Sequence, residues 1–275
     1  MSQPLRVLGV CGGLAVTALA ALRLSDRPAA ASPFFIPYGN PAAAAATGVP
    51  VLVELFTSEG CSSCPPADVV LGALERTQPV AGARVVPLGL HVDYWDRLGW
   101  TDPFSTPRAT ERQRAYAPLG SGSYTPQAVI DGHAETVGSR RGAIEQAIGE
   151  ASKRPHATIA VDLAARAGES APFEITLRVG PLPAGSASDA EAVVALTQNV
   201  ARVEVKRGEN GGSTLEHTAI ARDLVIAGAV AGAGGTLKTT IKAPLGVTGK
   251  DLRIVAFVQE RTARKVIGTA TRDAR

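Results

Sequence analysis

The chain has 275 residues, of which 45% are hydrophobic and 19% are charged, and its formal net charge at pH 7 is +3. This length allows one large domain or two ordinary ones, and the hydrophobic content is high enough for a folded core, which excludes a disordered chain. The small net charge and the lack of a lysine- or arginine-rich run in the sequence argue against nucleic-acid binding.

The N-terminus has the pattern of an export signal. Arg6 precedes an uncharged apolar run at residues 7–22, which is short for a membrane span of about 20 residues and suits a signal peptide. Residues 1–28 are therefore predicted to be a signal peptide or, if uncut, an N-terminal membrane anchor. Residues 29–48, rich in Ala and Pro, predict a flexible spacer. An exported protein, periplasmic or secreted, is expected, with membrane contact only through such an anchor.

The next part of the chain predicts an α/β domain at residues 49–154. Two apolar, β-branched segments flank an amphipathic helical one, which is a βαβ unit with normally parallel strands. A polar and aromatic insertion, two short strands around an Asp-Gly turn, and a final helix follow. These elements are expected at residues 49–57, 65–78, 83–92, 93–117, 125–138 and 139–154.

The pattern changes after Pro155. About eight short segments, among them residues 191–198 and 200–208, alternate polar and apolar residues and are separated by Gly, Pro, Ser or Asn. This spacing, without helical periodicity, predicts an all-β sandwich. We expect residues 155–275 to form a separate β-sandwich-like domain without a helix longer than two turns.

Cys61 and Cys64 form a C-x-x-C motif between the first predicted strand and helix. Cys11 leaves with the leader if cleavage occurs, so these two remain as the cysteines of the mature chain. Disulfides persist in exported proteins, but closing so small a loop stabilises the fold by only roughly 2 kcal/mol. A domain of this size does not need that bond, which favours a redox role over a structural one.

The position of the motif predicts which cysteine reacts. Backbone N–H groups and the helix dipole favour a thiolate at Cys61, which is expected to be the more exposed of the two. Cys61 would attack a disulfide and Cys64 would resolve the mixed disulfide. Two features oppose a very acidic nucleophile. Pro65 and its neighbour Pro66 place the helix start after Cys64, and Glu59 adds a nearby negative charge.

His91 ends the second predicted strand and allows a different interpretation. Together with Cys61 and Cys64 it would form a soft site for copper in a non-catalytic module; alternatively, it hydrogen-bonds within the strand end. His133, His156 and His217 are scattered, and the sequence has no zinc-binding spacing. No cofactor is expected.

Two other segments allow binding roles. Tyr94, Trp95 and Trp100 gather aromatic area in one insertion. They predict a groove for a peptide or apolar ligand, a cap over the sheet, or a contact with the β-rich part of the chain. The glycine-rich residues 207–218 lack the context of a phosphate-binding loop, and a structural turn is favoured.

Four strings, "LFTSEGCSSCPPAD", "HVDYWDRLGWTDPF", "YTPQAVIDG" and "RGENGGSTLEHT", together resemble an exported bacterial family, domain of unknown function 1223, over residues 49–271. The order of elements with "CSSC" and "YTP" resembles the thioredoxin fold. This resemblance implies a thioredoxin-like domain followed by a β-rich one, and no settled reaction.

The resemblance also implies roles for three residues. Thr125 and Pro126 would form a cis-proline loop facing the cysteines, although only about 5–6% of X-Pro bonds are cis. Glu54 would take the place of the buried acid that shuttles the proton of Cys64; a structural ion pair or an edge-facing side chain is the alternative.

The sequence thus favours an exported thiol-disulfide oxidoreductase acting on a protein or small thiol or disulfide, although it leaves open whether the chain is an enzyme. The alternative is a non-catalytic copper-binding or partner-binding module. Candidate catalytic residues are Cys61, Cys64 and Glu54, and candidate substrate-binding residues are Thr125, Pro126, Tyr94 and Trp95.

Overall fold

The computed structural model describes residues 48–169 and 171–274. The predicted leader and nearly all of the predicted spacer lie outside the described residues. All the described residues belong to one compact unit. Within the part of the chain that the structure describes, no helix is long and apolar enough to cross a membrane.

Three helices and eleven strands make up the described chain. The helices are α1 (Pro65–Thr77), α2 (Pro107–Arg114) and α3 (Arg141–Ala151). The strands are β1 (Val49–Thr57), β2 (Ala83–His91), β3 (Gln127–Ile130), β4 (Ala134–Val137), β5 (Ile159–Leu163), β6 (Phe173–Val179), β7 (Ala190–Glu204), β8 (Thr214–Ala229), β9 (Gly235–Ile241), β10 (Leu252–Glu260) and β11 (Val266–Asp273).

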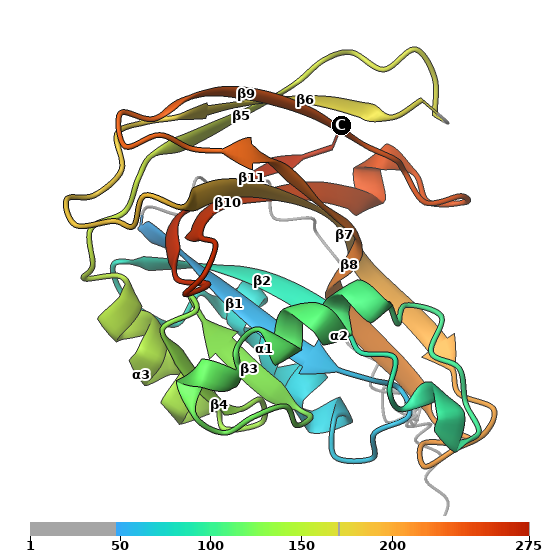
Figure 1. Ribbon diagram of the computed structural model, residues 1–275. Helices are drawn as coiled ribbons and strands as arrows, with labels where there is room; N and C mark the ends of the chain where they lie inside the picture. Colours follow the sequence, from blue (N-terminus) through green and yellow to red (C-terminus); the bar gives the residue numbers. More distant parts are fainter. Residues whose placement is uncertain (1–47, 170, 275) are drawn as a thin grey trace, which may run out of the picture. The chain divides into compact units, whose positions relative to one another are not determined.

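Eight strands form a single mixed sheet in the order β11-β10-β7-β8-β2-β1-β3-β4 (Figure 1). β1 and β2 are parallel and are connected through α1, as predicted, and β3 runs antiparallel to both β1 and β4. Three further strands form a second sheet, β5-β6-β9. The large sheet passes from β2 to β8 through one parallel pair, Gly89 and Ile220.

Side chains of β1 alternate between two cores because successive residues of a strand face opposite sides of the sheet. Val51, Val53 and Leu55 pack with residues of α1 and α3 on one face. Leu52 and Phe56 pack on the other face, with residues from α2 and from β7 and β10. A third core lies between β6 of the small sheet and strands β7 and β10 of the large one.

The structure differs from the expected division into two separately folded domains. The type of element changes where expected, since α3 ends at Ala151 and only strands and a 3-10 turn follow among the described residues. However, β7, β8, β10 and β11 belong to the same sheet as β1–β4. Two segments expected as separate strands, 191–198 and 200–208, form the long strand β7, which pairs with β8 along its length. Joining β8 to β2 covers an edge that would otherwise be unpaired.

Glu54 lies on the β1 face that packs against α2 and is fully buried. Arg112 of α2 binds both of its carboxylate oxygens, with Nη2 donating to Oε2 at 3.0 Å, and the Tyr116 hydroxyl donates to Oε2 as well. Arg112 also donates to Gln259 of β10 at 3.0 Å. The ion pair therefore connects β1, α2 and β10 across the core.

Replacing Arg112 by Met is expected to destabilise the fold strongly, because it leaves the Glu54 carboxylate buried without a counter-charge. Breaking such a pair from one side typically costs about 3–5 kcal/mol. The free energy of unfolding from urea titration measures the loss, and adding Glu54→Leu to the variant should restore most of it.

Arg141→Met serves as the control, because it breaks an exposed pair with Glu145 on α3 and should cost less than about 1 kcal/mol. An Arg112→Met protein as stable as this control would contradict the importance of the buried pair.

Candidate functional site

Cys61 and Cys64 are joined by a disulfide in the loop between β1 and α1. Cys64 is the N-cap residue of α1, whose first two residues are Pro65 and Pro66. The Cys61 N–H donates to the Ser58 carbonyl at 3.2 Å, and the Cys64 N–H donates to the Cys61 carbonyl at 3.1 Å. Cys61 thus lies in a turn before the helix, as the two prolines predicted.

The peptide bond between Thr125 and Pro126 is cis, as predicted, and lies directly before β3. The Thr125 hydroxyl donates a hydrogen bond to Cys61 Sγ at 3.3 Å. Trp95 Nε1 donates in turn to Thr125 Oγ1 at 2.9 Å. The aromatic insertion therefore positions the hydroxyl group that contacts the sulfur.

Both cysteine side chains are fully buried. The prediction that Cys61 is the more exposed of the two is wrong for this state, although the intervening Ser62 and Ser63 are exposed. Trp95 packs so close to Gly60 that a Cβ there would lie 3.0 Å from the Trp95 Cβ. Side chains of the insertion and of the cis-proline loop thus cover the disulfide from one side.

The loop between β7 and β8, residues 205–213, covers it as well. Asn210 Nδ2 donates to the main-chain carbonyls of Glu59 and Cys61 at 2.8 and 3.0 Å. Glu209 accepts a hydrogen bond from the Ser62 N–H at 2.9 Å. Residues 207–218, interpreted from the sequence as a structural turn, therefore also hold the C-x-x-C loop in place.

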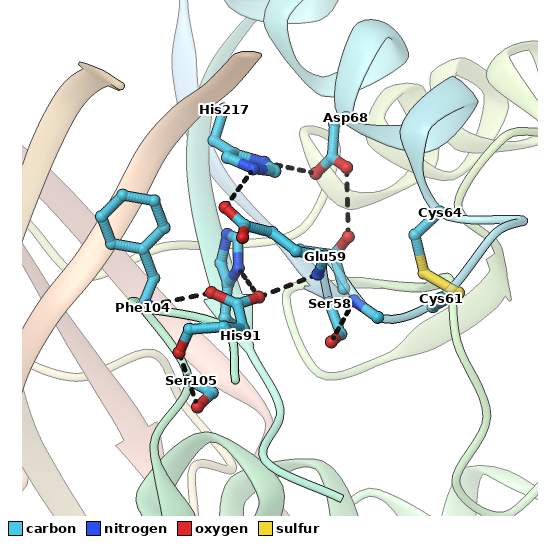
Figure 2. Close-up of polar contacts among 12 residues, drawn as sticks. Ser58, Glu59, Cys61, Cys64, Asp68, His91, Phe104, Ser105 and His217 are labelled. Carbon is cyan, nitrogen blue, oxygen red and sulfur yellow. Dashed lines mark hydrogen bonds and ion pairs between the residues drawn. A yellow bond between two sulfur atoms is a disulfide. The ribbon is translucent and has the colours of Figure 1, made fainter. Parts of the chain in front are cut away.

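A buried group of charged side chains lies next to the C-x-x-C loop (Figure 2). His217 of β8 directs Nε2 at Glu59 Oε1, 3.1 Å away, and Nδ1 at Asp68 Oδ1, 3.7 Å away. Trp100 Nε1 donates to the other Glu59 oxygen at 2.7 Å, and Thr57 donates to Asp68 at 3.2 Å. Glu59 and His217 are both buried, at 0% and 1% exposure.

The protonation of His217 depends on these carboxylates. Burial lowers the pKa of His217, but the hydrogen bonds and charges of Asp68 and Glu59 outweigh that effect and raise it to about 9. The imidazole is therefore a cation at neutral pH.

His91 belongs to a neighbouring pair and not to the cysteines. Its Nδ1 lies 2.7 Å from Asp102 Oδ2, which also accepts the Glu59 N–H at 2.8 Å. Burial acts to raise the pKa of Asp102, but the charge and hydrogen bond of His91 and two backbone N–H groups lower it overall. Within the described residues no group of His, Cys, Asp and Glu side chains has the geometry of a metal site. His91 therefore hydrogen-bonds at the strand end, as the alternative interpretation expected. Copper binding by His91 with Cys61 and Cys64 stays a prediction.

Glu54 also differs from its expected role. It faces the α2 side of β1, whereas the helix that begins after Cys64 packs on the opposite face. The alternative of a structural ion pair is correct, and Glu54 is not placed to accept a proton from Cys64.

The remaining candidates have different surroundings. Tyr94 donates its hydroxyl to Gln113 Oε1 of α2 at 3.2 Å, and burial raises its pKa. Thr125 contacts the Cys61 sulfur, Trp95 donates a hydrogen bond to Thr125, and Pro126 follows Thr125. Substrate binding by these four residues stays a prediction.

Sequence reasoning missed Asp68, Asp102, Asn210 and His217 as parts of the site. All four lie in strings that carried the family resemblance, which was the one signal that could have found them: Asp68 in the first string, Asp102 in the second, and Asn210 and His217 in "RGENGGSTLEHT".

Comparison with known proteins agrees with that resemblance. Residues 52–259 match the family described as a protein of unknown function, DUF1223. The chain belongs to this family. No curated protein matches.

Two solved structures are similar to this DUF1223 chain. The X-ray structure of protein AGR_C_4864 from Agrobacterium tumefaciens is 28% identical, with a TM-score of 0.64, and the match covers 83% of this chain and 96% of that one. HBP35 of Porphyromonas gingivalis is 16% identical, with a TM-score of 0.55, and the match covers 82% of this chain and 75% of that one. The second likeness shows a shared fold alone.

Replacing Asn210 by Ala is expected to speed reduction of the disulfide by dithiothreitol roughly tenfold. The variant loses two hydrogen bonds that hold the cover on the loop, each worth about 1 kcal/mol. The rate is measured by quenching with an alkylating reagent and counting free thiols.

Asn199→Ala is the matched control, because Asn199 lies on β7 and its Nδ2 contacts the Lys250 carbonyl at 3.5 Å. Equal reduction rates in the two variants would show that Asn210 does not limit access to the sulfurs.

His217 should also make stability depend on pH. Its pKa is raised from 6.5 to about 9 in the folded chain, so its stabilising contribution is complete below pH 6.5 and is lost as the pH rises through 9. The free energy of unfolding should fall over this range by an amount of the order of 3 kcal/mol.

The expected signal is the difference between the wild type and His217→Gln, measured by urea titration at several pH values. A difference that stays constant from pH 6 to pH 10 would contradict the raised pKa.

Proposed function

We propose that this chain is an exported thiol-disulfide oxidoreductase in which Cys61 attacks and Cys64 resolves. The observation that carries the proposal is the contact between Thr125 and the disulfide. The Cys61–Cys64 pair lies where β1 meets α1, and the Thr125 hydroxyl of the cis-proline loop is 3.3 Å from Cys61 Sγ. A disulfide that spans only three positions at a helix start is suited to reversible opening more than to stabilising the chain.

The fold that we propose for residues 49–154 is thioredoxin-like. Its support is the strand order β2-β1-β3-β4, with α1 after β1 and α3 after β4. For residues 155–275 we propose a sandwich-like arrangement, supported by the core between β6 and strands β7 and β10. The two parts share one sheet, so they are regions of one unit and not independent domains.

The reaction starts from the reduced pair. The Cys61 thiolate attacks one sulfur of a substrate disulfide, a mixed disulfide forms, and the other substrate sulfur leaves as a thiolate that takes up a proton. Cys64 then loses its proton, its thiolate attacks Cys61 Sγ, and the second substrate thiol is released. Two electrons pass from the cysteine pair to the substrate, and oxidation of a dithiol substrate is the same sequence reversed.

The substrate that we propose is a protein or a small-molecule thiol or disulfide, and no cofactor enters these steps. Export, to a periplasmic or extracellular location, is supported by the leader pattern of the sequence and by a disulfide at the C-x-x-C motif. Because both sulfurs are buried, a substrate can reach Cys61 only when the cover formed by Asn210 or by Trp95 is displaced.

A second candidate is a non-catalytic, partner-binding module in which the disulfide keeps the loop closed. The complete burial of both cysteine side chains favours this candidate. The two functions differ in whether Cys61 can form a bond to an external sulfur.

Cys64→Ser is expected to trap mixed disulfides, because Cys61 can still attack and no second thiol releases the adduct. Cys61→Ser should form none and should lose activity on a model disulfide. Adducts are compared on a non-reducing gel after incubation with glutathione disulfide or an oxidised peptide.

Both variants should remain folded, since the bond contributes only about 2 kcal/mol against a typical total of roughly 5–15 kcal/mol. Adducts in the Cys61 variant alone would reverse the roles. Adducts in neither variant, with both folded, would favour the partner-binding module.

A further inference from the structure

His217 connects the two ends of the C-x-x-C segment from a distant part of the chain. It contacts Glu59, two residues before Cys61, and Asp68, four residues after Cys64. The two carboxylates come from the loop after β1 and from α1, and the imidazole comes from β8. Figure 2 shows both carboxylates pointing toward the imidazole ring.

The two carboxylates favour an extra proton on His217. Ionised carboxylates only accept hydrogen bonds, and a neutral imidazole has one nitrogen that donates and one that accepts. Both ring nitrogens of His217 face carboxylate oxygens, at 3.1 and 3.7 Å. The imidazolium form donates a hydrogen bond from Nε2 to Glu59 and is attracted to Asp68, which lies at ion-pair distance from Nδ1 without a hydrogen bond. A neutral ring would lose the attraction to both carboxylates and would place a lone pair against one of them.

The side chains packed around His217 come from several elements, and His217 is the partner of both carboxylates. β2 presents His91, whose ring centre lies 4.7 Å from that of His217 and whose Nδ1 contacts Asp102. The Phe104 ring, 5.9 Å away, covers another side of the imidazole. Within the described residues the ion pairs of Glu59 and Asp68 are with His217 alone.

Asp68 gives this cluster a direct relation to Cys64. Its N–H donates to the Cys64 carbonyl at 3.2 Å, so the two residues are helical neighbours four positions apart. Side chains at this spacing lie on one face of the helix, and a helical side chain leans toward the preceding turn. The Asp68 carboxylate is therefore directed toward the turn that holds Cys64, with His217 behind it.

We propose that His217 is a positioning residue for the cysteine pair, one that offsets the charges of Glu59 and Asp68 and so stabilises the Cys61 thiolate in the reduced state. This inference rests on the proposed function and deepens it. Without the imidazolium, two buried negative charges would flank a third one forming at Cys61. Stabilising the thiolate stabilises the reduced pair, which makes the disulfide a stronger oxidant.

The test is the reduction potential of the pair in His217→Gln and in Asp68→Asn. Each protein is equilibrated in glutathione buffers of known ratio, and the fraction of reduced Cys61 and Cys64 is counted by alkylation and mass spectrometry. A nearby opposite charge shifts a pKa by about 1–3 units, and His217 acts through carboxylates, so we expect a change at the low end. His217→Gln should favour the disulfide roughly tenfold, a potential about 30 mV more negative.

Asp68→Asn should shift the equilibrium in the opposite direction, because it removes a negative charge and leaves the imidazolium bound to Glu59. A loosened structure would move both variants in the same direction, so opposite signs distinguish a charge effect from a packing effect. His156→Gln is the matched control. His156 pairs with Asp131 at 3.2 Å, on the turn between β3 and β4, and its loss should leave the potential unchanged.

A second measurement needs no variant. If the imidazolium stabilises the thiolate, the thiolate must raise the pKa of His217 by the same free energy. Ring NMR titration of the wild-type protein should therefore give a higher His217 pKa in the reduced form than in the oxidised form. An equal His217 pKa in both forms would overturn the inference. So would a redox equilibrium constant of His217→Gln within threefold of that of the wild type.

A failure of this inference can be told apart from a failure of the proposed function. The potential and the His217 titration are properties of the cysteine pair, and they can be measured in a chain that exchanges disulfides with no external substrate.

Discussion

The parallel contact between β2 and β8 is the constraint on which the candidate site depends. It places Gly89 beside Ile220, and a Cβ at Gly89 would lie 3.0 Å from the Thr218 carbonyl oxygen. Only glycine lets the two backbones approach so closely without a shift of one of them. From this point the β7–β8 hairpin extends to the end of β1, where His217 and Asn210 reach the C-x-x-C loop. A site that involves residues 57–126 is therefore completed by residues 209–217.

Buried charges then determine which distant segments meet. On one face of β1, Glu54 is held by Arg112, which also reaches Gln259. In the loop between β1 and α1, Glu59 forms an ion pair with His217. A buried charge without a partner is destabilising by several kcal/mol, so other arrangements of these segments are penalised. The Glu59–His217 pair and the hydrogen bond of Arg112 to Gln259 both cross position 154, so they hold the two regions together in one unit.

Local features of the sequence predicted most of the fold around the disulfide. The strand at 49–57 and the helix beginning at Pro65 follow from short-range patterns. The contact of Thr125 with Cys61 was expected only from the resemblance to the thioredoxin fold. The face of β1 on which Glu54 lies could not be predicted in this way. Both faces of this strand are apolar, so its sequence carries no polarity that shows which side α1 covers. The residues with the parity of Leu52 and Phe56 face α2, and Glu54 is one of them.

Long-range strand order accounts for the other omissions. Nothing in residues 207–218 alone shows that they pack on a loop about 150 positions earlier, because the packing depends on where β8 joins the sheet. The expected break between 191–198 and 200–208 was wrong for the same reason. Asn199 resembles a turn residue locally, but the continuous pairing of β7 with β8 overrides that preference.

The contacts of the hairpin with the loop are of two kinds, and they act on different properties of the disulfide. Asn210 is uncharged and binds main-chain carbonyls of the loop, which carry the same dipoles whether the sulfurs are oxidised or reduced. These contacts can hold a cover in place, and hence limit a rate, without favouring either redox state. His217 binds carboxylates whose field a thiolate would experience, so its charge acts on the equilibrium. One hairpin thus controls access and thiolate stability through separate residues, and each can change without the other.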